Sequence, residues 1–210
     1  MGKLELKKKK KKEALFNTAF ELFSTKGIAK TTISDIVEKA GVAKGTFYLY
    51  FKDKYDIRNS LISHKSGQIF FQAHEALLKS GITDFEEQII FIVHYIIDVL
   101  SNDPALLLFI AKNLSWGVFK GASQEQAEDE DYHFYEAYLA LLKESRYECK
   151  KPELLLFTIT ELVSSTCYSC ILYQQPVSME EYKPVLDRTI QGIIHSFCTC
   201  SLEASLQTND

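Results

Sequence analysis

Apolar side chains recur at helical spacing along most of the chain. The first segment carries a stripe at steps of three and four residues, made by Ala14, Leu15, Thr18, Ala19, Leu22 and Phe23. This is the pattern of an amphipathic helix, which we expect over residues 7–26. Gly27 should end it, because glycine readily takes the left-handed conformation that follows many helices. No segment alternates convincingly between apolar and polar positions, so no strand is expected.

Two short helices joined by a glycine are predicted next. Thr31 or Thr32 can cap a helix whose apolar positions follow the i, i+3, i+4, i+7 spacing. Those positions are Ile33, Ile36, Val37 and Ala40. Gly41 supplies the tight turn, and residues 44–51 form a third helix with Phe47 and Phe51 on its buried side. Two short helices with such a turn make a helix-turn-helix.

The remaining pattern predicts only helices, so the expected fold is all-α. We expect them at residues 53–79, 83–101, 104–119, 131–145, 152–173 and 179–200. The last two are apolar over more than one face, which predicts a homodimer that buries them against the same helices of a second copy. The longest apolar runs fall far short of the ~20 residues that a membrane span needs. We therefore expect no membrane-spanning helix and a cytoplasmic location.

Charge separates the two ends of the chain. Its formal net charge is −4, from 24 Lys plus Arg and 28 Asp plus Glu, yet residues 1–60 hold 14 basic and 7 acidic side chains. Such a basic segment favours a polyanionic partner. The lysine run from Lys7 to Lys12 is either a solvated face or an arm that contacts phosphates or a minor groove, and charge alone does not decide between them.

Candidate DNA contacts remain once the core positions of the helix-turn-helix are assigned. Small residues, hydroxyls, phenols and lysines at the start and on the exposed side of a helix suit a major groove and its phosphates. In the third helix these are Lys44, Gly45, Thr46, Tyr48 and Tyr50. Thr31, Thr32 and Lys54, at the starts of the second and fourth helices, are further candidates because amide groups at helix starts favour phosphate.

The run TTISDIVEKAGVAKGTFYLYFKDKYDI resembles the DNA-binding signature of the TetR family of bacterial transcriptional regulators. The resemblance covers about residues 10–60. It implies a three-helix DNA-binding domain, assigned here to residues 1–52, and a larger helical effector-binding and dimerisation domain at residues 53–210. One departure is Leu49, where many members carry histidine or an aromatic residue, so Tyr48 and Tyr50 must supply more of the backbone contact.

Family resemblance and composition together predict a homodimeric repressor. It would leave a palindromic operator of double-stranded DNA when a small hydrophobic or aromatic effector binds. Pockets are lined mainly by apolar and aromatic side chains with a few polar groups. The candidates for effector contact are Phe91, Tyr95, Asn113, Trp116, Tyr135 and Tyr168, although each fits an ordinary core position too.

Cysteines and histidines predict no catalytic or metal site. The five cysteines all lie at or after Cys149, and we expect them to be reduced and small apolar residues in a cytosolic chain. Cys167 and Cys170 form a CxxC without a second pair, and no histidine pair or nucleotide-binding glycine motif is present. We expect no enzyme, cofactor or metal. Open alternatives are a thiol-redox-responsive regulator, a DNA-architectural protein without an effector, and an enzyme that uses the helix-turn-helix otherwise.

Overall fold

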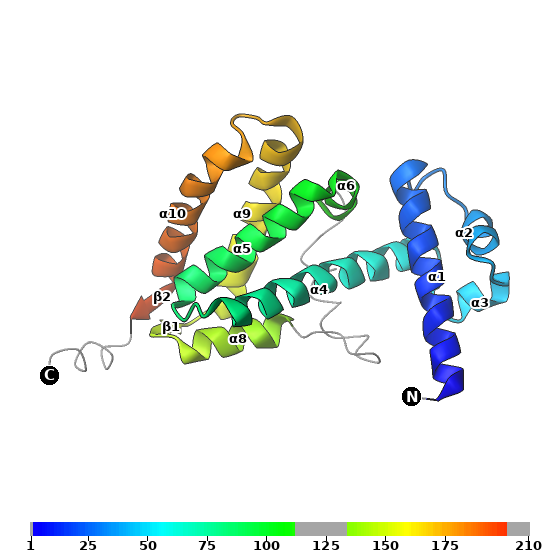
Figure 1. The fold of residues 1–210 in the computed structure, drawn as a ribbon, viewed down its shortest axis with the longest axis horizontal. Helices are drawn as coiled ribbons and strands as arrows, with labels where there is room; N and C mark the ends of the chain where they lie inside the picture. The colour runs from blue at the N-terminus through cyan, green and yellow to red at the C-terminus, as the bar shows by residue number, and fades with distance from the viewer. Residues whose placement is uncertain (1, 112–133, 201–210) are drawn as a thin grey trace, which may run out of the picture. The chain divides into compact units, whose positions relative to one another are not determined.

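The computed structural model describes residues 2–111 and 134–200, and helices make up nearly all of their regular structure (Figure 1). The elements are α1 Lys3–Thr25, α2 Ile33–Ala40, α3 Lys44–Tyr48, α4 Lys54–Ser80, α5 Phe85–Asn102, α6 Pro104–Ala111, α8 Phe134–Glu144, β1 Tyr147–Cys149, α9 Pro152–Tyr173, α10 Met179–Phe197 and β2 Cys198–Cys200. The all-α class predicted from the sequence is confirmed.

The described chain divides into two compact units. The N-terminal unit comprises residues 2–66 and 108–111, and the C-terminal unit comprises residues 67–107 and 134–200. The division falls inside α4, whereas the sequence placed it between residues 52 and 53. The reason is that Ile57, Leu61 and Ile62, in the first turns of α4, are fully buried. These turns complete the core of the N-terminal unit.

The N-terminal unit is built on the expected apolar stripe. Leu15, Ala19 and Phe23 of α1 are buried, together with Ile36 of α2 and Phe47 of α3. The Phe16 and Phe51 rings lie 5.5 Å apart between centroids and tie α1 to the segment after α3. The apolar periodicity therefore identified the faces that pack.

Capping interactions set the bounds of these helices. α1 begins at Lys3, earlier than residue 7, where the Gly2 backbone amide donates to Glu5 Oε2 at 2.8 Å. α2 begins after Thr32, whose hydroxyl accepts from the Asp35 amide while the Asp35 carboxylate accepts from the Thr32 amide. α2 ends at Gly41 with φ of +65°, a conformation that costs glycine little.

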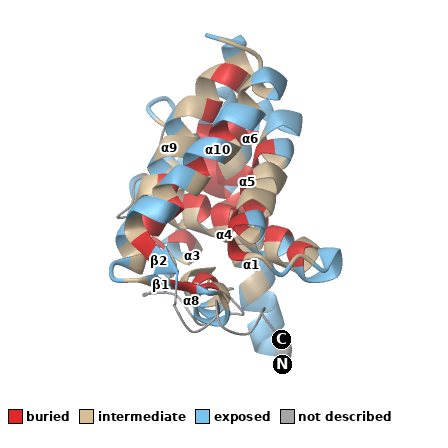
Figure 2. Ribbon diagram, turned by 90° about the vertical axis from the view of Figure 1, so that its left-hand side faces the viewer, coloured by how far each residue is buried: buried red, intermediate tan, exposed pale blue. Residues whose placement is uncertain are grey.

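α5, α9 and α10 pack together in the C-terminal unit (Figure 1). Each contains buried aliphatic residues, and buried positions are red on the ribbon in Figure 2. The fully or nearly fully buried members include Ile89, Val93, Ile97, Leu155, Leu156, Ile159, Leu186, Ile190 and Ile194. These residues form the helical core of the C-terminal unit.

β1 and β2 form a two-stranded antiparallel sheet, which the sequence analysis did not predict. Tyr147 pairs with Cys200, and Cys149 pairs with Cys198. Consequently α10 ends at Phe197, three residues before the predicted end. Strands of three residues are too short for a period-2 pattern to be seen, and residues 147–149 find their partner only after the chain has folded back.

Several apolar side chains of α9 are not buried by the rest of the described chain. By length and composition it is the described helix that could cross a membrane, and only 28% of its most apolar stretch is buried within the chain. Leu154 and Tyr173 on α9 and Val185 on α10 are exposed. One such helix is weak grounds for a membrane span, because core helices share this composition.

Candidate nucleic-acid interface

The turn between α2 and α3 holds α3 by its buried side. Val42 donates its amide to the Val37 carbonyl at 3.0 Å, and the Gly41 amide points back to the last turn of α2. Phe47 is fully buried and Phe51 nearly so. With its apolar side fixed in this way, α3 presents its other residues outward.

The outward side of α3 carries most of the residues predicted from the sequence. Lys44, Gly45 and Tyr48 are exposed, with Tyr48 at 53%, and Thr46 is half-buried. A Cβ added to Gly45 would have no neighbouring heavy atom within 4 Å. Nothing in residues 2–111 and 134–200 therefore requires glycine at this position. Leu49, where the sequence departs from the family pattern, is 80% exposed.

Tyr50 lies at the edge of this surface and faces α1. Its hydroxyl donates to the backbone carbonyl of Lys8 at 3.4 Å. The lysine-rich turns of α1 are thus adjacent to the end of α3, which sequence spacing did not predict because the two residues are 42 positions apart.

Thr31 and Thr32 have separate roles in the structure. Thr31 is fully buried, and its hydroxyl donates to the Gly27 carbonyl at 2.9 Å. This placement contradicts a phosphate contact by the Thr31 side chain, because the hydroxyl is occupied inside the unit. Thr32 is exposed and caps α2, so it remains the candidate of the two.

Lys54 also has partners within the chain. Its ammonium Nζ donates to the carbonyls of Ile28, Ala29 and Thr31 at 2.9, 3.1 and 3.2 Å. An ammonium has three donors, so these three bonds use its full capacity. In this structure Lys54 closes the loop between α1 and α2 instead of pointing a free charge outward.

The start of α4 is likewise occupied by a side chain. Asp53 Oδ1 accepts from the amides of Tyr55 and Asp56 at 2.7 and 2.9 Å. The predicted phosphate site on these amides is therefore filled by the carboxylate of Asp53, a capping residue whose sequence position could have indicated this.

The candidate effector residues do not all lie together. Phe91 and Tyr95 pack against a buried cluster formed by Ala73, Leu77 and Ile92. Tyr135 lies on α8 with its ring 6.1 Å from that of Tyr138. Tyr168 is not part of the cluster, and its ring contacts that of exposed Tyr173 at 6.0 Å. Asn113 and Trp116 lie outside the described residues.

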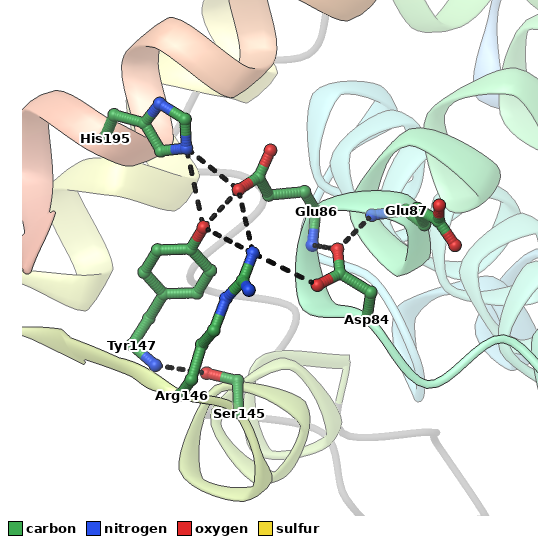
Figure 3. Close-up of polar contacts among 7 residues, drawn as sticks. All are labelled: Asp84, Glu86, Glu87, Ser145, Arg146, Tyr147 and His195. Atoms are coloured by element: carbon green, nitrogen blue, oxygen red, sulfur yellow. Dashed lines mark hydrogen bonds and ion pairs between the residues drawn. The ribbon is translucent and has the colours of Figure 1, made fainter. Parts of the chain in front are cut away.

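A polar cluster connects the start of α5, the start of β1 and α10 (Figure 3). Glu86 is 7% exposed and accepts from the Tyr147 hydroxyl, and its Oε1 lies 2.8 Å from His195 Nε2. Arg146 Nη2 lies 3.9 Å from the same oxygen and 3.5 Å from Asp84 Oδ2. The cluster joins residues from distant parts of the sequence.

The carboxylate of Glu86 is kept ionised by its partners. Burial opposes the charge, but the hydrogen bonds from Tyr147 and His195 outweigh it and lower the pKa of Glu86 below its ordinary value. Burial and then the hydrogen bond to Glu86 raise the pKa of Tyr147. The pair is therefore a phenol donating to a carboxylate.

Two cysteines are paired, contrary to expectation. Cys149 and Cys198 form a disulfide across the two-stranded sheet. Cys167 and Cys170 are free and buried, and burial raises the pKa of Cys167 to about 12. A buried thiol with a raised pKa is a poor nucleophile. The two cysteines of the CxxC in α9 are therefore interpreted as buried core residues. Cys200 is free and exposed.

With the helix-turn-helix geometry established, a family model described as bacterial regulatory proteins of the tetR family matches residues 12–61. Over this segment the chain is similar to the DNA-binding part of the TetR family. The match covers α1 from Lys12 onward, α2, α3 and the first turns of α4. The resemblance read from the sequence is thereby confirmed.

Two relatives from Bacillus subtilis (strain 168) extend this similarity. The chain is 31% identical over 137 residues to the uncharacterized HTH-type transcriptional regulator YvdT, covering 63% of each chain. It is 34% identical over 101 residues to the fatty acid metabolism regulator protein, covering 48% of this chain and 51% of that protein. The matched regions thus span less than two thirds of either relative.

The fold is also similar to solved TetR-family structures. One is the transcriptional regulator FadR from Bacillus subtilis in complex with stearoyl-CoA, with a TM-score of 0.59 and 20% sequence identity. The superposition covers 85% of this chain and 96% of that chain. At this identity the likeness shows a shared fold.

Proposed function

We propose that this chain is a homodimeric, DNA-binding transcriptional repressor that leaves a palindromic operator when a small hydrophobic or aromatic molecule binds its C-terminal unit. The observation that carries the proposal is the exposed side of α3. It places Lys44, Gly45 and Tyr48 outward on a helix held by Phe47 and Phe51.

These residues suit the edges and backbone of duplex DNA. The open space over Gly45 lets the helix backbone approach a groove closely, which a bulkier residue would hinder. Lys44 and Tyr48 supply an ammonium and a hydroxyl for phosphate oxygens, and Thr46 supplies a hydroxyl and a methyl group for base edges. Tyr50 follows the end of α3, and exposed Thr32 caps the start of α2.

A second copy would cover the apolar surface of α9 and α10. Leu154, Tyr173 and Val185 are exposed there in the single chain, and a Cβ on Gly192 would meet nothing within 4 Å. A two-fold dimer would also let each of its two α3 helices bind one half-site of the DNA, with the half-site centres about 34–36 Å apart. The last two helices are therefore the proposed dimer interface.

An effector would act on the apolar part of the C-terminal unit. Phe91 and Tyr95 lie against the cluster of Ala73, Leu77 and Ile92, which suits an apolar ligand. Stearoyl-CoA, present in the related FadR structure, is a rational first probe. α4 supplies residues to both units, so a ligand that displaces its second half would also act on its first half.

The test of DNA binding begins with selection of bound fragments from random duplexes, followed by footprinting. The decisive variant is Gly45→Ala, which adds only a methyl group where the chain has room. We expect folding stability to hold or rise, because alanine favours a helix more than glycine does. We expect affinity for the selected duplex to fall about tenfold, the effect of losing one good base contact.

Gly67→Ala is the matched control, because Gly67 is also helical and an added methyl group there would meet no heavy atom within 4 Å. It should leave DNA affinity unchanged. Equal affinities of wild type and Gly45→Ala for the selected duplex would show that α3 does not read the DNA sequence. Failure of the wild-type protein to prefer any fragment over bulk DNA would refute the whole proposal.

Two further measurements test the dimer and the effector. Sedimentation should show a dimer at micromolar concentration that Gly192→Ala weakens and Gly45→Ala does not. Stearoyl-CoA, hydrophobic cations and phenols should include a compound that raises the melting temperature and weakens DNA binding by about 5–150-fold, the usual range of allosteric coupling. Tyr95→Ala should remove that effect, and Tyr168→Ala should retain it. A monomer, or no response to any compound, would contradict the respective part.

A thiol-redox-responsive regulator is a second candidate, favoured by the Cys149–Cys198 disulfide and by exposed Cys200, which lies two residues after Cys198 on β2. Oxidation of the two thiols by hydrogen peroxide would form one disulfide and two waters. Thiol counting and DNA affinity with and without peroxide test it. Affinity that is the same in both states, and in Cys149→Ser, would exclude this candidate.

A further inference from the structure

The lysine run is part of a helix that begins well before it. α1 starts at Lys3, so Lys7 to Lys12 occupy its second and third turns. Lys7, Lys8, Lys10 and Lys11 are exposed, and the N-terminal turns of α1 are pale blue in Figure 2. Lys7, Lys8 and Lys11, at i, i+1 and i+4, share one side of the helix.

The nearby acidic side chains are used elsewhere. Glu5 accepts from the Gly2 amide at 2.8 Å, and Glu13 lies 3.7 Å from His64. Within residues 2–111 and 134–200, no acidic side chain forms an ion pair with Lys7, Lys8 or Lys11. Because like charges at i and i+4 repel, Lys7 and Lys11 destabilise the helix unless an outside anion neutralises them.

The lysine side of α1 lies next to the end of α3. The Tyr50 hydroxyl donates to the Lys8 carbonyl at 3.4 Å. One turn later, the Lys12 ammonium lies 5.8 Å from the centre of the Phe16 ring, which itself contacts Phe51. These contacts belong to the N-terminal unit and hold the charged turns beside the surface proposed to read DNA.

We propose that Lys7, Lys8 and Lys11 form a second anion-binding surface, which contacts phosphates of the duplex flanking the bases that α3 reads. This inference rests on the proposed DNA-binding function and adds a sequence-independent contribution to it. Ammonium groups neutralise phosphates and release counterions. A rigid helix that already presents them loses less conformational freedom on binding than a disordered tail.

An anionic membrane is the other polyanion that such a helix could meet. Leu4 is 71% exposed and Leu6 is 47% exposed, so the first turns carry some apolar surface. DNA is favoured because the Tyr50 contact holds the lysines against the end of α3, where a duplex on α3 would continue.

The experiment measures salt dependence on a selected duplex with long flanks, using the full chain. In the triple variant Lys7→Gln, Lys8→Gln, Lys11→Gln, we expect the slope of log affinity against log salt to become shallower by about 2.7, which is 0.9 for each of three phosphates. The triple arginine variant at the same positions should retain the wild-type slope. The matched control changes exposed Lys143, Lys150 and Lys151 to Gln and should also retain it.

Shortening the flanks provides the second readout. Trimming the duplex to the base pairs that the selected fragments share should make the wild-type slope equal to that of the glutamine variant. Equal slopes on the long duplex, with wild-type protein bound specifically, would overturn this inference and leave the proposed function intact. Loss of binding to phosphatidylglycerol vesicles in the glutamine variant, without a change in DNA slope, would also overturn it and assign the lysines to a membrane. No DNA binding by the wild type would refute both proposals.

Discussion

The two units of the chain use polar contacts of very different sequence range. In the N-terminal unit, Thr32 and Asp35 cap α2 from three residues apart, and Asp53 caps α4 from two and three residues away. In the C-terminal unit, the contact between Glu86 and His195 spans 109 residues and the disulfide spans 49. His94 and Asp187, 2.7 Å apart, are 93 residues apart in sequence.

This difference explains why one unit is readable from sequence and the other is not. Capping residues and turns act on their own neighbours, so residue type and spacing reveal them. A carboxylate that meets a histidine from the far end of the chain leaves no such pattern. The N-terminal unit also has long contacts, such as those of Lys54, and these are the ones that the sequence analysis missed.

The largest effect is expected at Glu86. Glu86→Ala should lower the free energy of unfolding by about 3–5 kcal/mol, because the buried carboxylate hydrogen-bonds to both Tyr147 and His195, and hydrogen bonds to charged groups contribute about 1.5–3 kcal/mol each. Chemical denaturation measures this loss. The control, exposed Glu87→Ala, should stay within about 0.5 kcal/mol of wild type.

The acid limb of the stability curve provides a check on the same residue. Because the pKa of Glu86 is lower in the folded state, its contribution is present above the unfolded pKa and is lost as pH falls through the folded one. Glu86→Gln should flatten that limb. An unchanged limb would mean that the carboxylate is not held ionised by Tyr147 and His195.

Removal of the disulfide should have the next largest effect. Cys149→Ser should lower the free energy of unfolding by about 2–4 kcal/mol, since the unfolded chain regains the freedom of a closed loop. Denaturation with and without dithiothreitol measures it, and reductant should shift wild type but not the variant. Cys200→Ser should preserve the wild-type response, and insensitivity of wild type to reductant would contradict the prediction.

Lys54→Ala should cost about 2 kcal/mol, because three loop carbonyls lose a charged donor. The slope of log DNA affinity against log salt should stay at the wild-type value. Exposed Lys52→Ala is the control for stability. The opposite result, unchanged stability with a slope shallower by about 0.9, would return Lys54 to the phosphate contact predicted from the sequence.

The smallest effect is expected at the cap of α2. Thr32→Ala should lower the free energy of unfolding by about 1 kcal/mol, the usual cost of losing a side-chain cap. Thermal denaturation measures it, and Thr32→Ser should restore most of the stability. If Ser and Ala behaved alike, the hydrogen bond from the Asp35 amide would not be the cause.

The sequence predicted the fold class, the helix-turn-helix and most helix positions. The predicted bounds of residues 152–173 agree with α9, since Pro152 and the apolar run act locally. Lys44, Gly45 and Tyr48 were identified because they remained outside the apolar stripe. Thr31 was named with Thr32 as a candidate cap and DNA contact because residue type alone does not tell a capping hydroxyl from a buried one. Asn113 and Trp116 stay predictions.

By itself, the sequence determined where helices form and which of their faces are apolar, because periodicity, caps and glycines act over a few residues. Only the tertiary structure decided the partners: the Cys149–Cys198 disulfide, the Glu86 cluster, the carbonyls bound by Lys54 and the place of Lys8 beside Tyr50. Such pairs form only when the chain folds back on itself, and no local pattern in a single sequence indicates which distant residues will meet.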